Sequence, residues 1–300
     1  MSEDFRTGYL AVVGRPNVGK STLVNRLVGA RVSITSKKAQ TTRHRIHGVL
    51  TNDACQYIFV DTPGFQTKHK NALNRIMNRN VSQSLVDVDV VLFVIEAGRW
   101  GEGEQALLSQ LPTERPVLLV INKIDRFADK NALLPFIQKV SMHHAFTEII
   151  PLSAESGAGI DGLLKTAGKF LPIAEPVFSP DDITDRSERF LAAELLREKL
   201  FRNLGEELPY GIAVEIEKFE LETDGPEELR RIYAAVIVDR EPHKAIVIGK
   251  GGERLKRVST DARKDMEKLF GGKVWLETWV KVKGGWADDE RALRSLGYES

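Results

Sequence analysis

A loop near the amino end has the residue types and the spacing that hold a triphosphate. It fits the pattern G-x-x-x-x-G-K-S, lies between an apolar run and a helical pattern, and consists of Gly14, Arg15, Pro16, Asn17, Val18, Gly19, Lys20, Ser21 and Thr22. Its glycines allow successive backbone N–H groups to point at phosphate oxygens. The Lys20 ammonium then reaches the β- and γ-phosphates, and the Ser21 hydroxyl ligates Mg²⁺. The loop therefore predicts that the chain binds a nucleoside triphosphate with Mg²⁺ as cofactor.

Two later loops predict which base is bound. Asn122-Lys123-Ile124-Asp125 follows a strand-like run, and Ser153-Ala154 follows the next one. The Asp125 carboxylate can accept hydrogen bonds from N1–H and the 2-amino group of guanine, whereas adenine has neither donor and would leave it unpaired. We expect Asn122 to tether the loop and the base edge, the Lys123 stem to cover the ring, and the Ala154 N–H to donate to guanine O6. The order of these loops favours GTP over ATP.

A third turn completes the predicted phosphate site, and it consists of Asp61, Thr62, Pro63 and Gly64. Asp61 is expected to hold Mg²⁺ through water, and the Gly64 N–H to sense the γ-phosphate, so that hydrolysis to GDP releases the segment behind it. Between the phosphate loop and this turn lies the pair Thr41-Thr42. One of these hydroxyls should complete the Mg²⁺ shell in the GTP state, and we favour Thr42.

The elements that must position these loops alternate along the first part of the chain. Apolar strand-like runs at 9–13, 49–50, 56–60, 90–95, 117–121 and 148–152 are separated by segments such as 22–28 and 161–170 that have helical spacing. This alternation predicts an α/β fold with a doubly wound, mostly parallel sheet and helices on both faces. The motifs fall at strand ends, where such sheets bind ligands.

A second, smaller α+β domain is expected after a proline-rich linker. The predicted boundaries are 1–172 for the nucleotide-binding domain, 173–188 for the linker, 189–283 for the second domain and 284–300 for a helical tail. The second domain reads as a helix at 189–204, strands at 212–219 and 231–239 around a polar turn at 220–226, a basic helix at 253–270 and a strand at 273–283. In the tail, Trp286 either caps the last strand or stacks on RNA.

The composition is that of an ordinary globular protein of 300 residues, with 42% hydrophobic and 28% charged residues. Cys55 is the single cysteine, which excludes an internal disulfide and suits a reducing compartment. The longest apolar run, 90–95, is too short to span a bilayer, and the first twenty residues lack a signal-peptide pattern. We therefore expect a cytoplasmic protein.

A glycine-rich loop in the second domain predicts RNA binding. Gly249-Lys250-Gly251-Gly252 fits the G-x-x-G loop of KH domains, which approaches a sugar-phosphate backbone beside an apolar groove for about four bases. Between 239 and 273 there are ten Lys or Arg against six Asp or Glu, although the net charge of the chain is only +1. The predicted RNA-binding residues are Ile248, Gly249, Lys250, Gly251, Gly252, Arg254, Lys256 and Arg257.

Two points about this second site stay open. Ile246, Ile248, Leu255 and Val258 either line the groove or form the core beneath it. Residues 245–248 have strand propensity, yet a KH domain needs a helical turn there.

Taken together, these motifs resemble those of the Era family of bacterial GTPases. The resemblance extends to Gln40–His44 (Q-T-T-R-H), to 183–186 and to 214–217, and so covers nearly the whole chain. It implies a GTPase domain joined to a type II KH domain. It also implies the 3′ region of 16S ribosomal RNA in the 30S subunit as partner, a role in maturing that subunit, and reported association with the inner membrane. No obligate protein partner is evident.

The mechanism has two features that the resemblance brings out. Phe65 stands where many Ras-like GTPases have the glutamine that orients the attacking water. Hydrolysis is therefore expected to be slow in isolation, or the water is placed by backbone groups, an ion or a partner. In GTPases with a similar phosphate loop, an asparagine at the position of Asn17 helps hold K⁺ beside the phosphates.

Two other functions fit the same motifs. The chain could be a GTPase of another RNA-linked pathway, such as transfer-RNA modification, whose second domain binds a protein. It could also be a structural RNA-binding protein whose nucleotide only stabilises the fold.

Overall fold

The computed structural model describes residues 4–36, 38, 41–64, 72–127, 130–205, 208–225, 227–296 and 298. The chain forms two compact units. The first comprises Met1–Ser33, Thr42–His69 and Met77–Asp185, and the second comprises Ile34–Thr41, Lys70–Ile76 and Arg186–Ser300.

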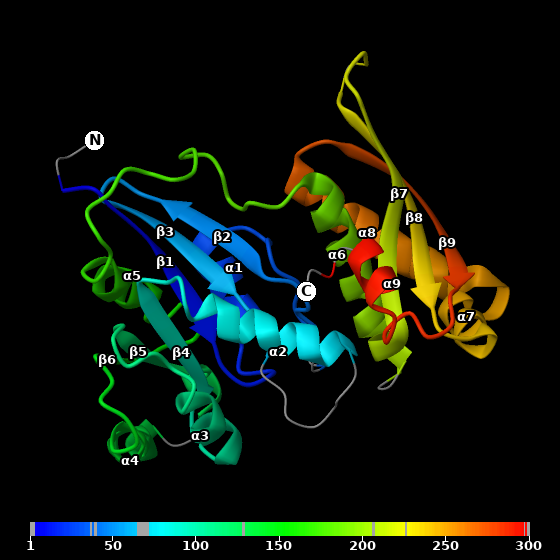
Figure 1. Ribbon diagram of the computed structural model, residues 1–300. Helices are drawn as coiled ribbons and strands as arrows, with labels where there is room; N and C mark the ends of the chain where they lie inside the picture. Colours follow the sequence, from blue (N-terminus) through cyan, green and yellow to red (C-terminus); the bar gives the residue numbers. More distant parts are fainter. Residues whose placement is uncertain are drawn as a thin grey trace. The chain divides into compact units, whose positions relative to one another are not determined.

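The first unit is built on a six-stranded sheet with the strand order β2-β3-β1-β4-β5-β6 (Figure 1). The strands are β1 (Arg6–Val13), β2 (Ile46–Thr51), β3 (Cys55–Asp61), β4 (Val90–Glu96), β5 (Val117–Asn122) and β6 (Glu148–Pro151). All neighbouring strands are parallel except β2 and β3, which are antiparallel. The predicted α/β class is therefore confirmed.

Helices cover both faces of this sheet. They are α1 (Lys20–Val28), α2 (Ala72–Ser84), α3 (Glu102–Leu108), α4 (Leu133–Ser141) and α5 (Ile160–Gly168). Side chains of α1 and α5 share one buried cluster with Leu10 and Val12 of β1, whereas α2, α3 and α4 contribute to a second cluster with Ala11 and Val13. Because successive strand residues face opposite sides, β1 is apolar throughout its second half and buried on both faces.

The sequence located the strands but not all the helices. β1 begins at Arg6 rather than at 9, β2 extends over Ile46–Thr51 rather than two residues, and α2, α3 and α4 were not identified. Most of the segment expected to be a linker (173–188) belongs to the first unit, which extends to Asp185. The Gln56 carboxamide binds the backbone of Val177 and Phe178 at 2.7–2.9 Å, and Thr184 forms a β-bridge with Gly48. These bonds satisfy backbone groups that a free linker would expose.

The second unit has a three-stranded sheet in the order β7-β8-β9. Its elements are α6 (Glu188–Asn203), a 3₁₀ turn (Leu208–Gly211), β7 (Ile212–Glu222), β8 (Leu229–Val238), α7 (Glu241–Ile248), α8 (Glu253–Phe270), β9 (Lys273–Val282) and α9 (Glu290–Ser295). Strands β7 and β8 are antiparallel, β8 and β9 are parallel, and α6 and α8 share one core with the sheet. This is the KH arrangement that the sequence predicted.

Three details of the second unit bear on the predictions. The polar turn expected at 220–226 begins later, because β7 continues to Glu222. Residues 245–248 lie in helix α7 despite their strand propensity, which confirms the helical turn that a KH domain needs. Pro242 lies near the start of α7. Proline favours the first turn of a helix, because the N–H that proline lacks would have no partner within the helix there.

The tail belongs to the core of the second unit. The Trp286 side chain is 1% exposed, its Nε1 donates to the Gly211 carbonyl at 3.1 Å, and its ring stacks on Tyr298. The interpretation of Trp286 as an RNA-stacking residue is therefore wrong, and the capping alternative fits. None of the helices in the described ranges combines the length and apolarity that a membrane crossing requires.

Candidate nucleotide site and candidate RNA groove

The phosphate loop connects β1 to α1 and requires glycine for steric reasons. Gly19 has φ 100°, and a Cβ there would lie 2.3 Å from the Asn122 Nδ2 atom. Any other residue would therefore both strain the backbone and displace the base-binding loop. Asn17 also adopts a left-handed conformation, with φ 66°.

Lys20 is buried within this loop. Its Nζ donates to the carbonyl oxygens of Gly14 at 2.9 Å and Arg15 at 3.0 Å. Burial lowers the pKa of Lys20 from 10.5 to about 8, although the Asp61 carboxylate raises it. The ammonium is thus held at the mouth of the loop in the position where it can meet a phosphate.

Three oxygen-bearing side chains from separate segments meet beside Lys20. Ser21 Oγ donates to Asp61 Oδ2 at 2.8 Å and lies 2.7 Å from Thr42 Oγ1. Asp61 is fully buried, and burial raises its pKa while a hydrogen bond from Ser33 and the Lys20 charge lower it. The other carboxylate oxygen, Oδ1, is buried and has no hydrogen-bonding partner among the described residues.

This cluster fits Mg²⁺, which prefers hydroxyl, carboxylate and water oxygens around substrate phosphates. The described residues contain no group of three His, Cys, Asp or Glu side chains that could hold a metal instead. Thr42 lies in the cluster and Thr41 does not, because the Thr41 hydroxyl donates to the Lys38 carbonyl at 2.7 Å.

The turn after β3 lies against the phosphate loop. Thr62 Oγ1 donates to the Val12 carbonyl at 2.9 Å, which fixes the turn to β1. A Cβ on Gly64 would approach the Pro16 backbone to 2.9 Å, so Gly64 and Pro63 pass directly beside the loop that holds the phosphates. Phe65 and Gln40 lie outside the described residues.

Asn122 joins the two base-recognition loops to the phosphate loop. Its Nδ2 donates to the Val18 carbonyl at 2.9 Å, and its Oδ1 accepts from the N–H groups of Lys123 and Ala154 at 2.8 and 2.9 Å. The tethering part of the prediction fits this geometry. The Ala154 N–H, however, was expected to donate to guanine O6, and in this structure it is already bound to the Asn122 carboxamide. The contact between the Ala154 N–H and guanine O6 stays a prediction.

Ser153 and Asp125 are the other residues of the two base-recognition loops. Ser153 is buried and its Oγ accepts from the Ser156 N–H at 3.1 Å, which shapes the loop. Asp125 lies in a 3₁₀ turn (Ile124–Arg126), and its carboxylate is 31% exposed, open to a ligand that offers donors.

Two acidic residues of the site were missed because they belong to no motif. Glu96 Oε2 accepts from Lys123 Nζ at 2.9 Å, and the same ammonium donates to the Asn17 carbonyl at 2.6 Å. Glu104, buried in α3, accepts from Arg15 Nη1 at 3.2 Å. These ion pairs hold the two sides of the phosphate loop, and only the three-dimensional arrangement reveals them.

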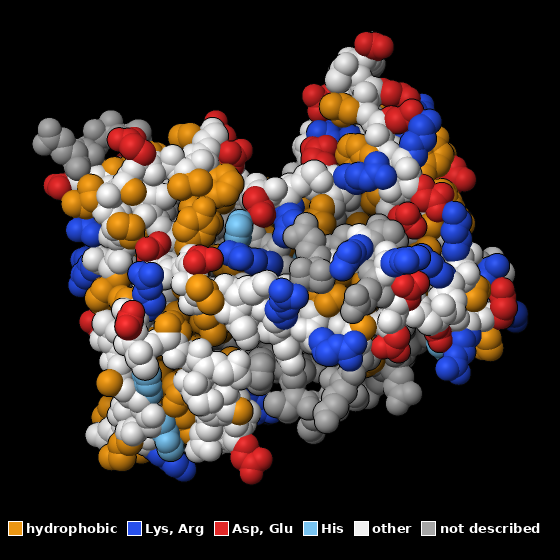
Figure 2. All heavy atoms as spheres, in the orientation of Figure 1, with side chains coloured by type: hydrophobic (Ala, Val, Ile, Leu, Met, Phe, Trp, Pro, Cys, Tyr) orange, Lys and Arg blue, Asp and Glu red, His pale blue; other side chains and the backbone are white. Residues whose placement is uncertain are grey.

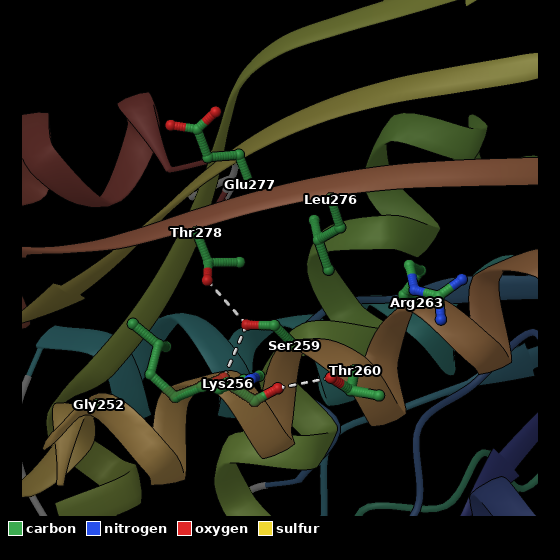
Figure 3. A pocket seen from close by; sticks show the side chains of 9 residues that line it. Gly252, Lys256, Ser259, Thr260, Arg263, Leu276, Glu277 and Thr278 are labelled. Carbon is green, nitrogen blue, oxygen red and sulfur yellow. Dashed lines mark hydrogen bonds between the residues drawn. The ribbon is translucent and has the colours of Figure 1, made fainter. Parts of the chain in front are cut away.

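The candidate RNA groove is about 400 Å³ in volume and lies between α8 and β9 (Figure 3). It is lined by Gly252, Leu255, Lys256, Ser259, Thr260, Arg263, Leu276, Glu277 and Thr278. Leu276 and Thr278 point from β9 toward α8, where Thr278 lies 2.7 Å from the Ser259 hydroxyl, whereas the Glu277 side chain points away. Leu255 and Leu276 are thus the apolar side chains of the groove, and most of its other lining residues are polar or charged.

The glycine-rich loop stands at one end of this groove. Gly249 has φ 74°, Gly251 59° and Gly252 80°, and Gly252 precedes the first turn of α8, whose N–H groups receive no side-chain cap. Lys250 extends from the same loop and is exposed. Such a loop can approach a phosphate closely.

The other predicted RNA-binding residues divide into two groups. Lys256 lines the groove, but Arg254 donates to the Ile246 carbonyl and Arg257 to Asn203 Oδ1 of α6. Of the four apolar residues left open by the sequence, Leu255 lines the groove and packs against the core, and Val258 is in the core. Ile248 packs against the core without lining the groove, and Ile246 is exposed. Figure 2 shows that Lys and Arg alternate with Asp and Glu over the second unit on the face drawn, so the positive charge is local.

The segment Ile34–Thr41, which lies between Ser21 and Thr42 in the sequence, belongs to the second unit. The Thr35 N–H donates to Glu198 Oε1 at 3.0 Å, Arg197 Nη2 donates to the Thr41 carbonyl at 2.6 Å, and Lys38 Nζ binds carbonyls at the end of α6. Arg197 is itself held by Glu194 at 2.6 Å. Thr35, Lys38 and Thr41 are therefore each bonded to α6 or to its end.

Comparison with known protein families separates the same two parts of the chain. Residues 9–123 match the family described as 50S ribosome-binding GTPase, and residues 207–287 match the KH domain family. Among similar relatives, the GTPase Era of Nitrosomonas eutropha is 58% identical over 295 residues, covering 98% of each chain. The GTPase Era of Bordetella avium is 53% identical over 298 residues, covering 99% of each chain.

Two solved structures are similar over the whole chain. One is a variant of Aquifex aeolicus Era bound to GDP·AlF4⁻, and the other is Era in complex with MgGDPNP and nucleotides 1506–1542 of 16S ribosomal RNA. Each is 43% identical, has a TM-score of 0.94, and matches 99% of this chain and 100% of its own.

Proposed function

The chain belongs to the Era family of GTPases, and from this membership we propose that it is a GTP-driven switch that binds 16S ribosomal RNA near its 3′ end and assists assembly of the 30S subunit. It hydrolyses GTP to GDP and phosphate. The observation that carries the proposal is the meeting of Ser21, Thr42 and Asp61 beside Lys20, on a chain that also has a KH groove.

The geometry supports in-line attack of water on the γ-phosphorus. Lys20 and the loop N–H groups bind and orient the phosphates, and positioning with charge stabilisation provides most of the catalysis. Ser21, Thr42 and Asp61 would hold Mg²⁺, which neutralises charge on the phosphate oxygens when bound. In this proposal the Gly64 N–H donates to the γ-phosphate and Asp125 selects guanine, and the closeness of Gly64 to Pro16 of the phosphate loop supports the first of these roles.

A potassium ion is the second cofactor in this proposal. Asn17 is held in a left-handed conformation, and its carbonyl is bound by Lys123, so its side chain projects from a fixed point of the loop. Turnover in KCl should exceed turnover in NaCl at equal ionic strength, and Asn17→Ala should remove the difference. Equal turnover of the wild-type protein in both salts would contradict this role.

Localisation follows from the same proposal. A protein that acts on ribosomal RNA works in the cytoplasm. Peripheral association with the inner membrane is implied by the family resemblance alone, and flotation of the purified protein with anionic vesicles tests it directly.

The RNA part of the proposal is tested at the glycine-rich loop. Lys250→Asp with Gly251→Asp should abolish binding of an RNA containing the 3′ end of 16S ribosomal RNA, because two carboxylates would face the sugar-phosphate backbone. GTP turnover without RNA should stay within about twofold of wild type, since the loop is far in sequence from every nucleotide-binding motif.

A matched control is Lys264→Asp, a charge reversal on an exposed position of α8 that does not line the groove. It should weaken RNA binding far less than Lys250→Asp alone. If the loop variants retained wild-type RNA affinity, the second unit would instead be assigned to a protein partner.

A further inference from the structure

Ser33 belongs to no motif, yet it touches the centre of the nucleotide site. It is 1% exposed, and its Oγ donates to Asp61 Oδ2 at 2.5 Å. We propose that Ser33 is a positioning residue for magnesium, which fixes the Asp61 carboxylate in the orientation that the metal requires. The inference rests on the proposed Mg²⁺–GTP site. It adds to that site a residue outside the phosphate loop, the Thr41-Thr42 pair and the turn that begins at Asp61.

Ser33 is itself held in place by a two-bond bracket. The Ser33 N–H donates to Asn25 Oδ1 at 2.9 Å, and Asn25 Nδ2 donates to the Ser33 carbonyl at 2.6 Å. Asn25 lies one helical turn after Ser21 on α1, so both residues share a face of that helix. One rigid helix therefore supplies the hydroxyl expected to ligate Mg²⁺ and the carboxamide that places the second hydroxyl.

Ser21 and Ser33 leave the two oxygens of the Asp61 carboxylate in different states. Both donate to Oδ2, at 2.8 Å from Ser21 and 2.5 Å from Ser33, whereas the buried Oδ1 has no partner among the described residues. A carboxylate bonded on one oxygen cannot rotate freely, so in this proposal Oδ1 stays available to accept from a metal-bound water. Loss of a partner that orients a metal-binding group commonly lowers metal affinity by about 10- to 100-fold.

The two hydrogen bonds with Asn25 also explain how Ser33 can stay in place when the segment after it rearranges. Ser33 is the last residue of the first unit before residues 34–41 join the second. Its backbone is bonded at both its N–H and its carbonyl to α1, whereas the next residues are bonded to α6. Ser33 can therefore hold Asp61 while the segment that follows it rearranges.

The test is the dependence of nucleotide release on Mg²⁺. Fluorescent GDP is loaded onto the full-length protein, and its release is followed at increasing free Mg²⁺. In Ser33→Ala, the Mg²⁺ concentration that gives half of the maximal slowing should rise about tenfold or more. The release rate in EDTA should match that of wild type, because Ser33 contacts the carboxylate and not the loop that binds the phosphates. Ser33→Thr, which restores the hydroxyl, should recover most of the Mg²⁺ response.

Two further variants separate positioning from simple loss of stability. Ser84→Ala removes another buried serine hydroxyl, which donates to the Asn80 carbonyl in α2 at 2.7 Å, and should leave the Mg²⁺ midpoint unchanged. Asn25→Leu, which removes the bracket, should shift the midpoint in the same direction as Ser33→Ala.

The failures are distinguishable. If Mg²⁺ does not slow release from the wild-type protein, the proposed nucleotide site itself is wrong. If wild type responds and Ser33→Ala responds at the same Mg²⁺ concentration, or if Ser84→Ala shifts the midpoint as much, Ser33 has no positioning role.

Discussion

Lys20 and Asp61 are buried charges of opposite sign in the same small site, and neither is there for stability. Removing a charge from water costs several kcal/mol, about as much as its attraction to a partner returns. The burial that lowers the pKa of Lys20 and raises that of Asp61 is therefore an energetic cost that bound phosphates and Mg²⁺ would offset. The site is built for its ligands rather than for the protein alone.

The Lys20 shift predicts a pH dependence of stability. Its pKa is about 8 in the folded protein and 10.5 ordinarily, so between these values the unfolded chain holds the extra proton. The free energy of unfolding of the nucleotide-free protein should therefore rise with pH across this window, by about 2 kcal/mol between pH 7.5 and 9.5 from this residue. Denaturant unfolding measures it, with Lys20→Met as the control that lacks the contribution. A difference between the two proteins that does not change with pH would contradict the shift.

At the scale of elements, the periodicity of apolar residues was sufficient to predict a helix or strand where one strong pattern continued without interruption. The basic helix α8 begins and ends where the sequence placed it, and each motif lies at a strand end as predicted. Helix α2 was not identified although its buried residues Leu73, Ile76, Met77 and Val81 have helical spacing, and α4 was missed because Pro135 lies in its first turn.

The site was predictable only as far as its motifs reach. Glu96, Glu104 and Ser33 come from separate strands, helices and loops, and nothing in their spacing relates them to the phosphate loop. Their roles arise from the strand order, which places the ends of β1, β3, β4 and β5 side by side. The bond between the Ala154 N–H and Asn122 Oδ1 also needed the structure, because a sequence does not show which acceptor a backbone N–H meets.

The turn between α7 and α8 leads to a prediction about glycine. Gly249 has φ 74°, and an added Cβ would lie 2.8 Å from the Arg254 Cβ. Gly249→Ala should therefore lower the free energy of unfolding of the second unit by about 1–3 kcal/mol through strain and crowding. Gly252→Ala is the matched control, since φ is 80° but no atom lies within 4 Å of the added Cβ. Thermal unfolding should show the larger loss for Gly249→Ala, and equal losses would mean that crowding is unimportant.

At the scale of the whole molecule, the chain passes from one unit to the other and back between two magnesium-site residues. Ser33 and Thr42 belong to the first unit, while residues 34–41 between them belong to the second, where Thr35 and Thr41 are bonded to α6. In the proposed mechanism, a change at Thr42 on hydrolysis would pass along the chain to a segment that is bonded to α6.

This connection predicts that Lys38 contributes to coupling. Its ammonium caps the last carbonyls of α6, an interaction worth about 0.3–1 kcal/mol. Lys38→Met should reduce the ratio of RNA affinities measured with a GTP analogue and with GDP by about two- to fivefold, since the cap stabilises one arrangement of residues 34–41. Lys268→Met, an exposed position on α8 outside the groove, should leave that ratio unchanged. An unaltered ratio in Lys38→Met would show that the signal travels elsewhere.

The central place of β1 in its sheet has a consequence for synthesis on the ribosome. β1 emerges well before its sheet neighbours β3 and β4, which begin at residues 55 and 90. Asn122 and Ala154 come later still, and about 130 residues separate Ser21 from Ala154. At roughly 5–20 residues per second, a nascent chain waits on the order of 7–27 s before it can close around guanine nucleotide. During that interval the phosphate loop is unsupported, so chaperones have their best opportunity to act on this protein before its own ligand stabilises it.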